Sequence, residues 1–447
     1  MPKKCDVSNT EVAEICKNNI KTDLGKFDEE EEKVYSKEET IKAIETFFET
    51  NDKVKYISRE SASKIRFSNK MIKDDKKEIG FYSVVKEAFK NTNRKNLLKL
   101  NATIDDYSVK DSFIGFMYSD GDGLGDFLKH TKDKYEEKDN NNRESEIEYL
   151  RFLRKFSIIL DYNTKKALLE VLIELKEKEK FKSLKKDEKK LIVGEFLIVG
   201  GDDVCAVFPA DLVLEISNKF QKKFEEKMKA FEEFENKNEK EKNKGDNITS
   251  SSGVIIAKSK TPMFQLFDQA LGRQKNAKLK RYNDNKYRDK KSVKTGYIDF
   301  QVIGSEGNVD IKKYRKKFEG EGKEQVTERP YAVNSENSFK YTDEKGKSVE
   351  TKDIQILIDK IKRLQKEEFP KTKIRYIFDT KINDEKTSDE KIMEMTNILS
   401  KMSKENLELL NEEWKIEEKL KISSQNNENK FNVFEDIYDV LEMYDFI

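Results

Sequence analysis

The sequence predicts an α+β fold: a sheet domain with the element order βαββαβ and an extra αβ unit, followed by a helical domain. Two observations predict it. Between residues 112 and 303, apolar runs of strand length alternate with longer segments in which apolar residues recur at helical spacing. After residue 351, the apolar residues follow helical spacing alone.

One strand and one hairpin define the first half of the sheet domain. An apolar strand at 112–119 leads through a glycine-rich loop into a helical region. Residues 145–188 have the pattern of a long, charged helix. Residues 192–208 have the pattern of a β-hairpin, and the adjacent glycines Gly200 and Gly201 suit its tight turn.

The second half begins with a helix that Asp211 is placed to cap. This helix carries an apolar stripe made of Leu212, Leu214, Ile216, Phe220 and Phe224. A strand at 248–259, a helix at about 262–280 and a strand at Tyr297–Ile303 complete the domain.

This order is the split β-α-β arrangement of ferredoxin-like palm domains. In that topology the first strand lies antiparallel to the third, so the end of one lies beside the start of the other. Asp120 ends the first strand and Asp203 begins the third. The topology therefore predicts that these two carboxylates meet at one edge of the sheet.

The remaining segments carry no chemical motif of their own. Residues 1–110 are mixed and mostly helical, with helical spacing in Thr40–Thr50 and Phe81–Phe89 and a short strand pattern at Val54–Ser58. C-terminal helices are expected at 352–367, 388–412 and 432–445. We divide the chain into an N-terminal region, a palm with a helical insertion, a connector and a helical domain: 1–110, 111–305 with the insertion at about 131–190, 306–350 and 351–447.

Composition excludes several classes of function. The chain has 447 residues, and its 89 Lys and Arg residues nearly balance 88 Asp and Glu, which excludes a strongly basic nucleic-acid-binding coat. Its three cysteines are too few and scattered for a disulfide framework or a zinc ribbon. The single histidine, His130, cannot build a histidine-based nuclease, a catalytic triad or a zinc hydrolase, and we expect it on the surface.

The same survey bears on the compartment. The sequence has no signal-peptide pattern and no apolar run long enough to cross a bilayer. We therefore expect a cytoplasmic protein without a membrane partner.

Two acidic strand tips are the candidate chemical centre. One is Asp120-Gly121-Asp122, and the other is the Gly200-Gly201-Asp202-Asp203 turn. Carboxylates at the ends of apolar strands are costly unless a cation or hydrogen bonds compensate them. Each motif alone could be an ordinary Asp/Gly turn. Their joint placement favours a shared site for Mg²⁺ or Mn²⁺, ions that prefer oxygen ligands and carry nucleotide phosphates.

Such a site predicts two-metal phosphoryl transfer. Asp120 and Asp203 are the expected bridging ligands, with the Gly121 carbonyl as a backbone ligand and Asp202 and Asp122 as second choices. Backbone amide groups of the hairpin turn, and of the helix start that follows the first acidic strand, are expected to bind triphosphate. These amides belong to Gly123, Leu124, Gly125, Gly200 and Gly201. The side chain of Lys278 is the expected phosphate contact, with Arg273 and Lys275 as weaker candidates.

Together these motifs resemble one family, the large polymerase/cyclase subunit of type III CRISPR effector complexes of the Cmr and Csm types. The GGDEF nucleotidyl cyclases are more distant and share only the palm. The resemblance covers roughly residues 112–447. It is carried by the two acidic tips and by three further segments, which are Ser251–Ala257, Ala277-Lys278 and Arg329-Pro330-Tyr331.

The resemblance implies conversion of ATP to cyclic oligoadenylate, with magnesium or manganese as cofactor. It also implies that Asp120 and Asp203 are metal ligands, that Asp202 supports the site and that Lys278 contacts triphosphate. The family pairs two palms, so the second palm is expected from another copy of this chain or from another subunit. CRISPR effector subunits and RNA are the further partners.

Our leading hypothesis is therefore a metal-dependent nucleotidyltransferase that makes a cyclic oligonucleotide messenger in CRISPR-type antiviral defence. One alternative is a standalone homodimeric cyclic-dinucleotide synthase. The other is a non-catalytic scaffold subunit of a CRISPR ribonucleoprotein that binds ATP. Intact Asp120, Asp202 and Asp203 disfavour the scaffold, because a scaffold does not require them.

Overall fold

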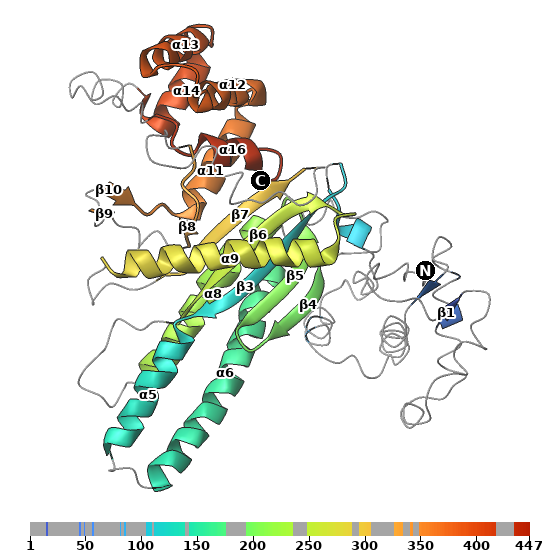
Figure 1. Ribbon diagram of the computed structural model, residues 1–447, viewed down its shortest axis with the longest axis vertical. Helices are drawn as coiled ribbons and strands as arrows, with labels where there is room; N and C mark the ends of the chain where they lie inside the picture. The colour runs from blue at the N-terminus through green and yellow to red at the C-terminus, as the bar shows by residue number, and fades with distance from the viewer. Residues whose placement is uncertain are drawn as a thin grey trace. The chain divides into compact units, whose positions relative to one another are not determined.

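The computed structural model (Figure 1) divides into two compact units, residues 1–89 and 90–447. The residues that the structure describes are mostly in the second unit: 104–109, 111–138, 143–175, 194–235, 248–287, 295–304, 326–333, 340–342, 348–416 and 433–447. In the first unit they are Ile15–Cys16, Ile44, Glu45, Glu49, Tyr56–Ile57, Phe81 and Val85.

The first unit contains a small antiparallel ladder. Strand β1 (Ile15–Cys16) pairs with β2 (Tyr56–Ile57), which lies inside the predicted strand at Val54–Ser58. The helices predicted at Thr40–Thr50 and Phe81–Phe89 lie mostly outside the described residues, and their few described positions are helical.

The second unit is built on a six-stranded mixed sheet with the order β4-β5-β3-β6-β7-β8. Its strands are β3 (Phe113–Asp122), β4 (Glu195–Gly200), β5 (Asp203–Pro209), β6 (Thr249–Lys258), β7 (Tyr297–Ile303) and β8 (Tyr331–Ala332). Central β3 is antiparallel to both β5 and β6, and β7 runs parallel to β6. The first strand of the palm thus lies between its third and fourth, which confirms the α+β prediction with an added αβ unit.

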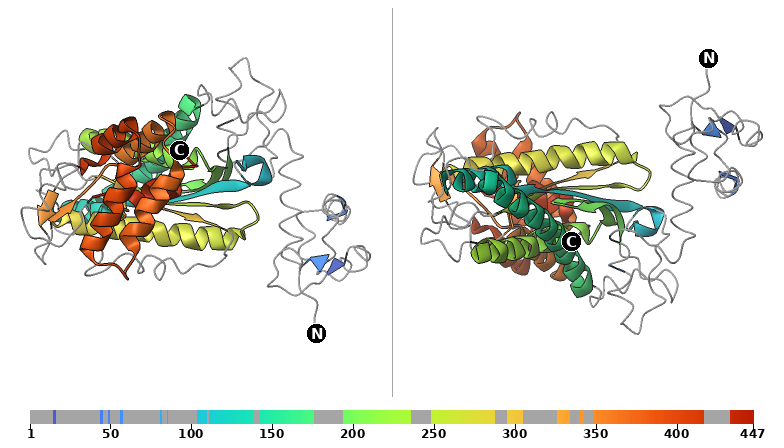
Figure 2. Two further views of the ribbon diagram at one scale, coloured as in Figure 1. Left: turned by 90° about the horizontal axis from the view of Figure 1, so that it is seen from above. Right: turned by 90° about the horizontal axis from the view of Figure 1, so that it is seen from below.

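Helices cover both faces of the sheet. The helices are α5 (Leu124–Lys138), α6 (Arg143–Leu175), α8 (Val213–Glu235) and α9 (Met263–Asn285). Figure 2 shows α9 on one face and α8 on the other. Helix α6 packs on α8, and α5 and α6 form a helical pair that extends beyond the sheet in Figure 1.

Close helix approach explains two glycines in the sheet. A Cβ atom on Gly115 would lie 2.4 Å from Val213 of α8, and one on Gly253 would lie 1.9 Å from the Ala270 carbonyl oxygen of α9. Successive residues of a strand face opposite sides. The even-numbered residues of β3, including Phe116 and Asp120, therefore face α9.

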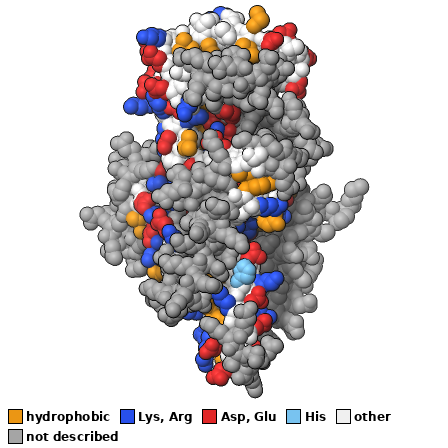
Figure 3. All heavy atoms as spheres, turned by 90° about the vertical axis from the view of Figure 1, so that its left-hand side faces the viewer, with side chains coloured by type: hydrophobic (Ala, Val, Ile, Leu, Met, Phe, Trp, Pro, Cys, Tyr) orange, Lys and Arg blue, Asp and Glu red, His pale blue; other side chains and the backbone are white. Residues whose placement is uncertain are grey.

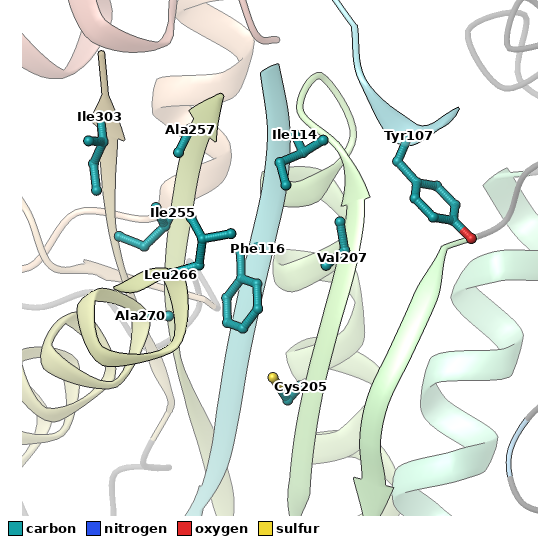
Figure 4. Packing of buried hydrophobic residues seen from close by; sticks show 10 residues of the cluster. All are labelled: Tyr107, Ile114, Phe116, Cys205, Val207, Ile255, Ala257, Leu266, Ala270 and Ile303. Atoms are coloured by element: carbon teal, nitrogen blue, oxygen red, sulfur yellow. The ribbon is translucent and has the colours of Figure 1, made fainter. Parts of the chain in front are cut away.

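Ten buried residues form the hydrophobic core between α9 and the sheet (Figure 4). Its members are Tyr107, Ile114, Phe116, Cys205, Val207, Ile255, Ala257, Leu266, Ala270 and Ile303. Cys205 is a buried free thiol within this cluster, where it packs as a small apolar residue.

Helices dominate the C-terminal part of this unit. They are α11 (Ile354–Lys366), α12 (Lys371–Ile382), α13 (Ser388–Ser400), α14 (Lys404–Trp414) and α16 (Ile437–Met443). The short strands β9 (Lys340–Thr342) and β10 (Ser348–Glu350) pair with each other. The 3-10 turn η3 (Ile104–Tyr107) lies outside this part, before β3 in the chain. Helix α16 contacts β7 as well as α11 and α12.

Two C-terminal elements differ from the sequence prediction. The helix expected at 388–412 is two helices, because the side chain of Ser403 accepts a hydrogen bond from the Asn406 amide and caps the second. Helix α12 was not predicted. Its buried face includes Lys381, whose ammonium group donates to the Val433 carbonyl, so the apolar periodicity is weak there. The domain boundaries proposed from the sequence stay predictions.

The described helices include none that is both long enough and apolar enough to span a membrane.

His130 is exposed on α5, and Figure 3 shows the histidine side chain at the surface among charged groups.

Candidate active site

The ends of β3 and β5 place the acidic residues together. The last pair between β3 and β5 is Ser119 with Val204, so Asp120 and Asp203 are the next residues on these adjacent strands and face α9. Strand β3 does not end at Asp120, as the sequence predicted, because its pairing with β6 continues to Asp122. Asp202 lies in the turn between β4 and β5. Burial raises the pKa of Asp202 to about 6, and hydrogen bonding with the Asp120 carboxyl adds to this rise. The three carboxyl groups therefore form one interacting cluster.

Helix α9 brings a cation to this cluster. The Lys278 ammonium lies 2.7 Å from Asp120 Oδ2 and donates to the Gly121 carbonyl oxygen at 2.8 Å. Gln274, one turn earlier, donates from Nε2 to Asp120 Oδ2 at 3.2 Å. The i, i+4 spacing puts both side chains on the same face of the helix. Two side chains of α9, Lys278 and Gln274, thus donate hydrogen bonds to the Asp120 carboxylate.

Asp203 is held from within the sheet. The Tyr118 hydroxyl donates to Asp203 Oδ1 at 3.1 Å, and the Tyr118 ring packs edge-on against Phe267 of α9. Burial raises the pKa of Asp203, and the negative charge of Asp120 raises it further. Positive charge placed between Asp120 and Asp203 would relieve this repulsion.

Glycines allow the strand tips to approach one another. A Cβ atom on Gly121 would lie 2.8 Å from Asp202 Oδ2, so the carboxyl group of Asp202 lies directly against the backbone of β3. At the turn, Gly201 has a φ of +61°, in the left-handed region that favours glycine. Positive φ occurs at Gly201 and not at Gly200, although both were expected to serve the turn.

Asp122 plays a different part from the other acids. It is buried, and its Oδ2 accepts hydrogen bonds from Thr249 (3.0 Å) and Ser251 (2.7 Å) of β6. Arg281 of α9 lies 3.5 Å from the same oxygen. Its other oxygen, Oδ1, is 3.9 Å from the Lys278 ammonium. Asp122 thus lies close to two cationic side chains of α9, those of Lys278 and Arg281.

The glycine-rich loop becomes the start of α5. Gly123 has a φ of +76°, and the helix begins at Leu124, with Gly125 in its first turn. The Gly123 carbonyl accepts the first helical hydrogen bond, from Phe127. The amides of this first turn directly follow the acidic tip of β3, where the sequence analysis expected triphosphate.

The donor set fits a hard divalent cation in its chemistry. Asp120, Asp203, Asp202 and the Gly121 carbonyl offer only oxygen atoms, which suit Mg²⁺ and Mn²⁺. Among the described residues, no group of three or more His, Cys, Asp or Glu side chains converges as a metal cage in the present arrangement. Lys278 occupies the cationic position beside Asp120 instead. Metal binding stays a prediction.

Several contacts of the site were not found from the sequence. Tyr118 lies two residues before Asp120, so strand periodicity could have placed it on the same face. Gln274 lies four residues before Lys278, so helical periodicity could have found it. The weaker candidate Arg273 faces elsewhere, because it is buried with its guanidinium 3.7 Å from Asp299. Lys275 is exposed.

Comparison with known families bears on this segment. Residues 113–288 match the family model of the Cas10/Cmr2 second palm domain. The segment is similar to a Cas10 palm. The match spans β3 to the end of α9 and contains Asp120, Asp202, Asp203 and Lys278. No match is found among curated proteins. The relation to GGDEF cyclases stays a prediction.

For the nucleotidyl transfer that the sequence predicts, we expect Lys278→Met to lower kcat/KM for nucleoside triphosphate by about 10- to 100-fold, because a positive charge beside the phosphates would be lost. Initial rates of pyrophosphate release measure the effect. Lys275→Met, which removes an exposed lysine of the same helix, is the matched control and is expected to change the rate little. Equal losses in both variants would show that only the general charge of α9 matters.

Proposed function

We propose that this chain is a nucleotidyltransferase that makes a cyclic oligonucleotide messenger, cyclic oligoadenylate from ATP, as part of a CRISPR-type antiviral response. A polymerase/cyclase type of function fits the Cas10 palm that the segment resembles. One observation carries the proposal: the adjacent ends of β3 and β5, the turn before β5 and helix α9 bring three interacting carboxyl groups and the Lys278 ammonium group into one cluster.

The residues divide the work as follows. Asp120, Asp203 and the Gly121 carbonyl would hold Mg²⁺ or Mn²⁺, which when bound supplies charge neutralisation at the phosphates and activation of the attacking hydroxyl. Lys278 provides a second positive charge next to these ligands. Tyr118 fixes the Asp203 carboxyl, and Gln274 fixes that of Asp120. The start of α5 offers backbone N–H groups to triphosphate oxygens.

The proposal includes a second palm. The match is to the palm that the family model describes as the second one, and the sequence resemblance implies a pair of palms around the nucleotides. We propose that the partner palm comes from another subunit of a CRISPR complex, with RNA among the bound components. Another copy of this chain is the alternative source.

Mass spectrometry of the reaction products tests the proposal. The full chain is incubated with mixed nucleoside triphosphates and Mn²⁺, alone and with candidate CRISPR subunits and RNA. We expect phosphatase-resistant cyclic adenylates, and we expect Asp202→Ala/Asp203→Ala to abolish them. A cyclic dinucleotide from a homodimer of measured solution mass would favour the standalone alternative. No pyrophosphate release under any of these conditions would overturn the enzymatic function.

A further inference from the structure

We propose that Asp161 and Thr164 of α6 are positioning residues that hold the Gly200-Gly201 turn and thereby aim the carboxylates of Asp202 and Asp203. This inference rests on the proposed function and extends it to a helix for which the sequence predicts no chemical role. The long insertion before the hairpin would then be part of the machinery of the site.

The contacts reach both polar backbone groups of one glycine. The Gly201 amide donates to Asp161 Oδ1 at 3.1 Å, and the Thr164 hydroxyl donates to the Gly201 carbonyl oxygen at 2.6 Å. The Leu160 carbonyl oxygen, 2.9 Å from the same hydroxyl, competes for its single proton. The second oxygen of Asp161 accepts from the Lys165 ammonium at 2.7 Å, which fixes the carboxylate in place.

Gly201 is the position where such contacts have most leverage. It adopts positive φ and precedes Asp202 directly. A glycine has the widest range of backbone conformations, so contacts from outside the turn are needed to select one of them. With its N–H and C=O groups both bound by α6, the peptide planes on either side of Gly201 have fixed orientations. The direction in which the chain enters Asp202 and Asp203 is fixed with them.

Helix α6 is itself anchored, so it can serve as a rigid support. Its Glu170 binds the Lys227 ammonium of α8 at 2.8 and 2.9 Å, and its Glu174 binds Lys223 at 2.6 Å. The buried amide of Asn163 lies 3.5 Å from the sulfur of Met228. Helix α8 in turn packs on β3 and β6. Through α8, helix α6 therefore connects the turn to the face of the sheet that α9 does not cover.

Paired threonine variants test the role. Thr164→Val keeps the side-chain shape but removes the donor to Gly201. The matched control is Thr131→Val on α5, where the hydroxyl also donates to the carbonyl four residues earlier, that of Phe127 at 2.8 Å, a bond that stays within the helix. We expect Thr164→Val to lower kcat by about 10- to 100-fold, because small misplacements of catalytic groups have effects of this size. The KM for ATP should change little in either variant.

Asp161 provides a test by rescue. Asp161→Ala removes the acceptor for the Gly201 amide, whereas Asp161→Asn keeps an oxygen that can accept the same hydrogen bond. We expect Asp161→Asn to retain most of the kcat that Asp161→Ala loses. Hydrogen exchange in a peptide containing residues 200–204 gives a readout that needs no activity. Exchange should become about tenfold faster in Asp161→Ala, since the local opening free energy falls, and stay near wild type in Asp161→Asn.

The readouts separate this inference from the proposed function. Unchanged exchange in Asp161→Ala would overturn the support of the turn, whatever the activity. Faster exchange with an unchanged kcat in an active enzyme would overturn the positioning role. An inactive wild-type protein would overturn the proposed function, and the catalytic part of the positioning role with it, while the exchange data would still decide whether α6 holds the turn.

Discussion

Asp203→Asn is expected to lower the rate of product formation by about 100- to 1,000-fold, the size of effect seen when an enzyme loses one preorganised polar group at the reacting centre. The substitution keeps the shape of the side chain. It also keeps an oxygen that can accept the Tyr118 hydroxyl, which now lies 3.1 Å from Asp203 Oδ1. What it removes is the negative charge. The loss of activity should therefore come without a loss of fold.

The direction in which the melting temperature of this variant changes relative to wild type can also be predicted. The folded-state pKa of Asp203 is raised above the usual value of 3.8, so the fold disfavours the ionised carboxylate relative to the unfolded chain. This cost is present at pH values above the raised pKa and disappears as the pH falls below the usual value. In EDTA at neutral pH, Asp203→Asn should thus melt at the same temperature as wild type or higher, and any gain should vanish in acid.

Asp133→Asn is the control, since Asp133 is an exposed carboxylate on α5. It should leave both the rate and the melting temperature near wild type. If Asp203→Asn instead melted well below wild type, its inactivity would be explained by damage to the fold, and the assignment of Asp203 to the chemistry would lose its support.

Much of the sheet could be predicted from the sequence because strand periodicity and topology act together. The pattern at Tyr297–Ile303 gave the bounds of β7 without error, and the antiparallel relation of the first and third strands brought Asp120 to Asp203. Successive residues of a strand face opposite sides of the sheet, so the positions of Asp120 and Asp203 along their strands are enough to place both side chains on the same face. Helix ends in the C-terminal part were harder to place, because Ser403 and Lys381 act through hydrogen bonds that apolar spacing does not reveal.

The support of the site could not be predicted in the same way. Asp161 and Thr164 lie about forty residues before the turn that they bind. On a charged helix, an aspartate and a threonine carry no signal that separates them from solvated neighbours. Only the three-dimensional path of α6 brings them to Gly201. Contacts between distant segments that depend on a single donor and acceptor are therefore the part of this site that required the structure.

A buried arginine joins the C-terminal helices to the sheet. The Arg329 guanidinium lies 2.7 Å from Asp439 and 2.6 Å from Glu442 of α16, and it donates to the Phe300 carbonyl of β7 at 2.8 Å. Its carbon Cζ is 4.7 Å from the centre of the Phe300 ring and 4.6 Å from that of Tyr438. The side chain has no exposed surface. Charge pairing and ring contacts thus combine at one point between β7 and α16.

Arg329→Met is expected to lower the free energy of unfolding of this unit by about 3–5 kcal/mol, because it leaves buried carboxylates without their cation. Urea unfolding followed by the fluorescence of Trp414, the only tryptophan, measures the loss where it should occur, since Trp414 is buried against Phe434 in the C-terminal part.

Arg363→Met is a matched control, because Arg363 also pairs with two glutamates, Glu412 and Glu413, but in an exposed position on α11. Exposed pairs contribute no more than about 1 kcal/mol, so this variant should unfold close to wild type. Adding Asp439→Asn to Arg329→Met should recover part of the loss, because it removes one of the two uncompensated charges. Equal, small losses in Arg329→Met and Arg363→Met would mean that the aromatic rings and apolar packing, and not the buried charges, hold α16 to β7.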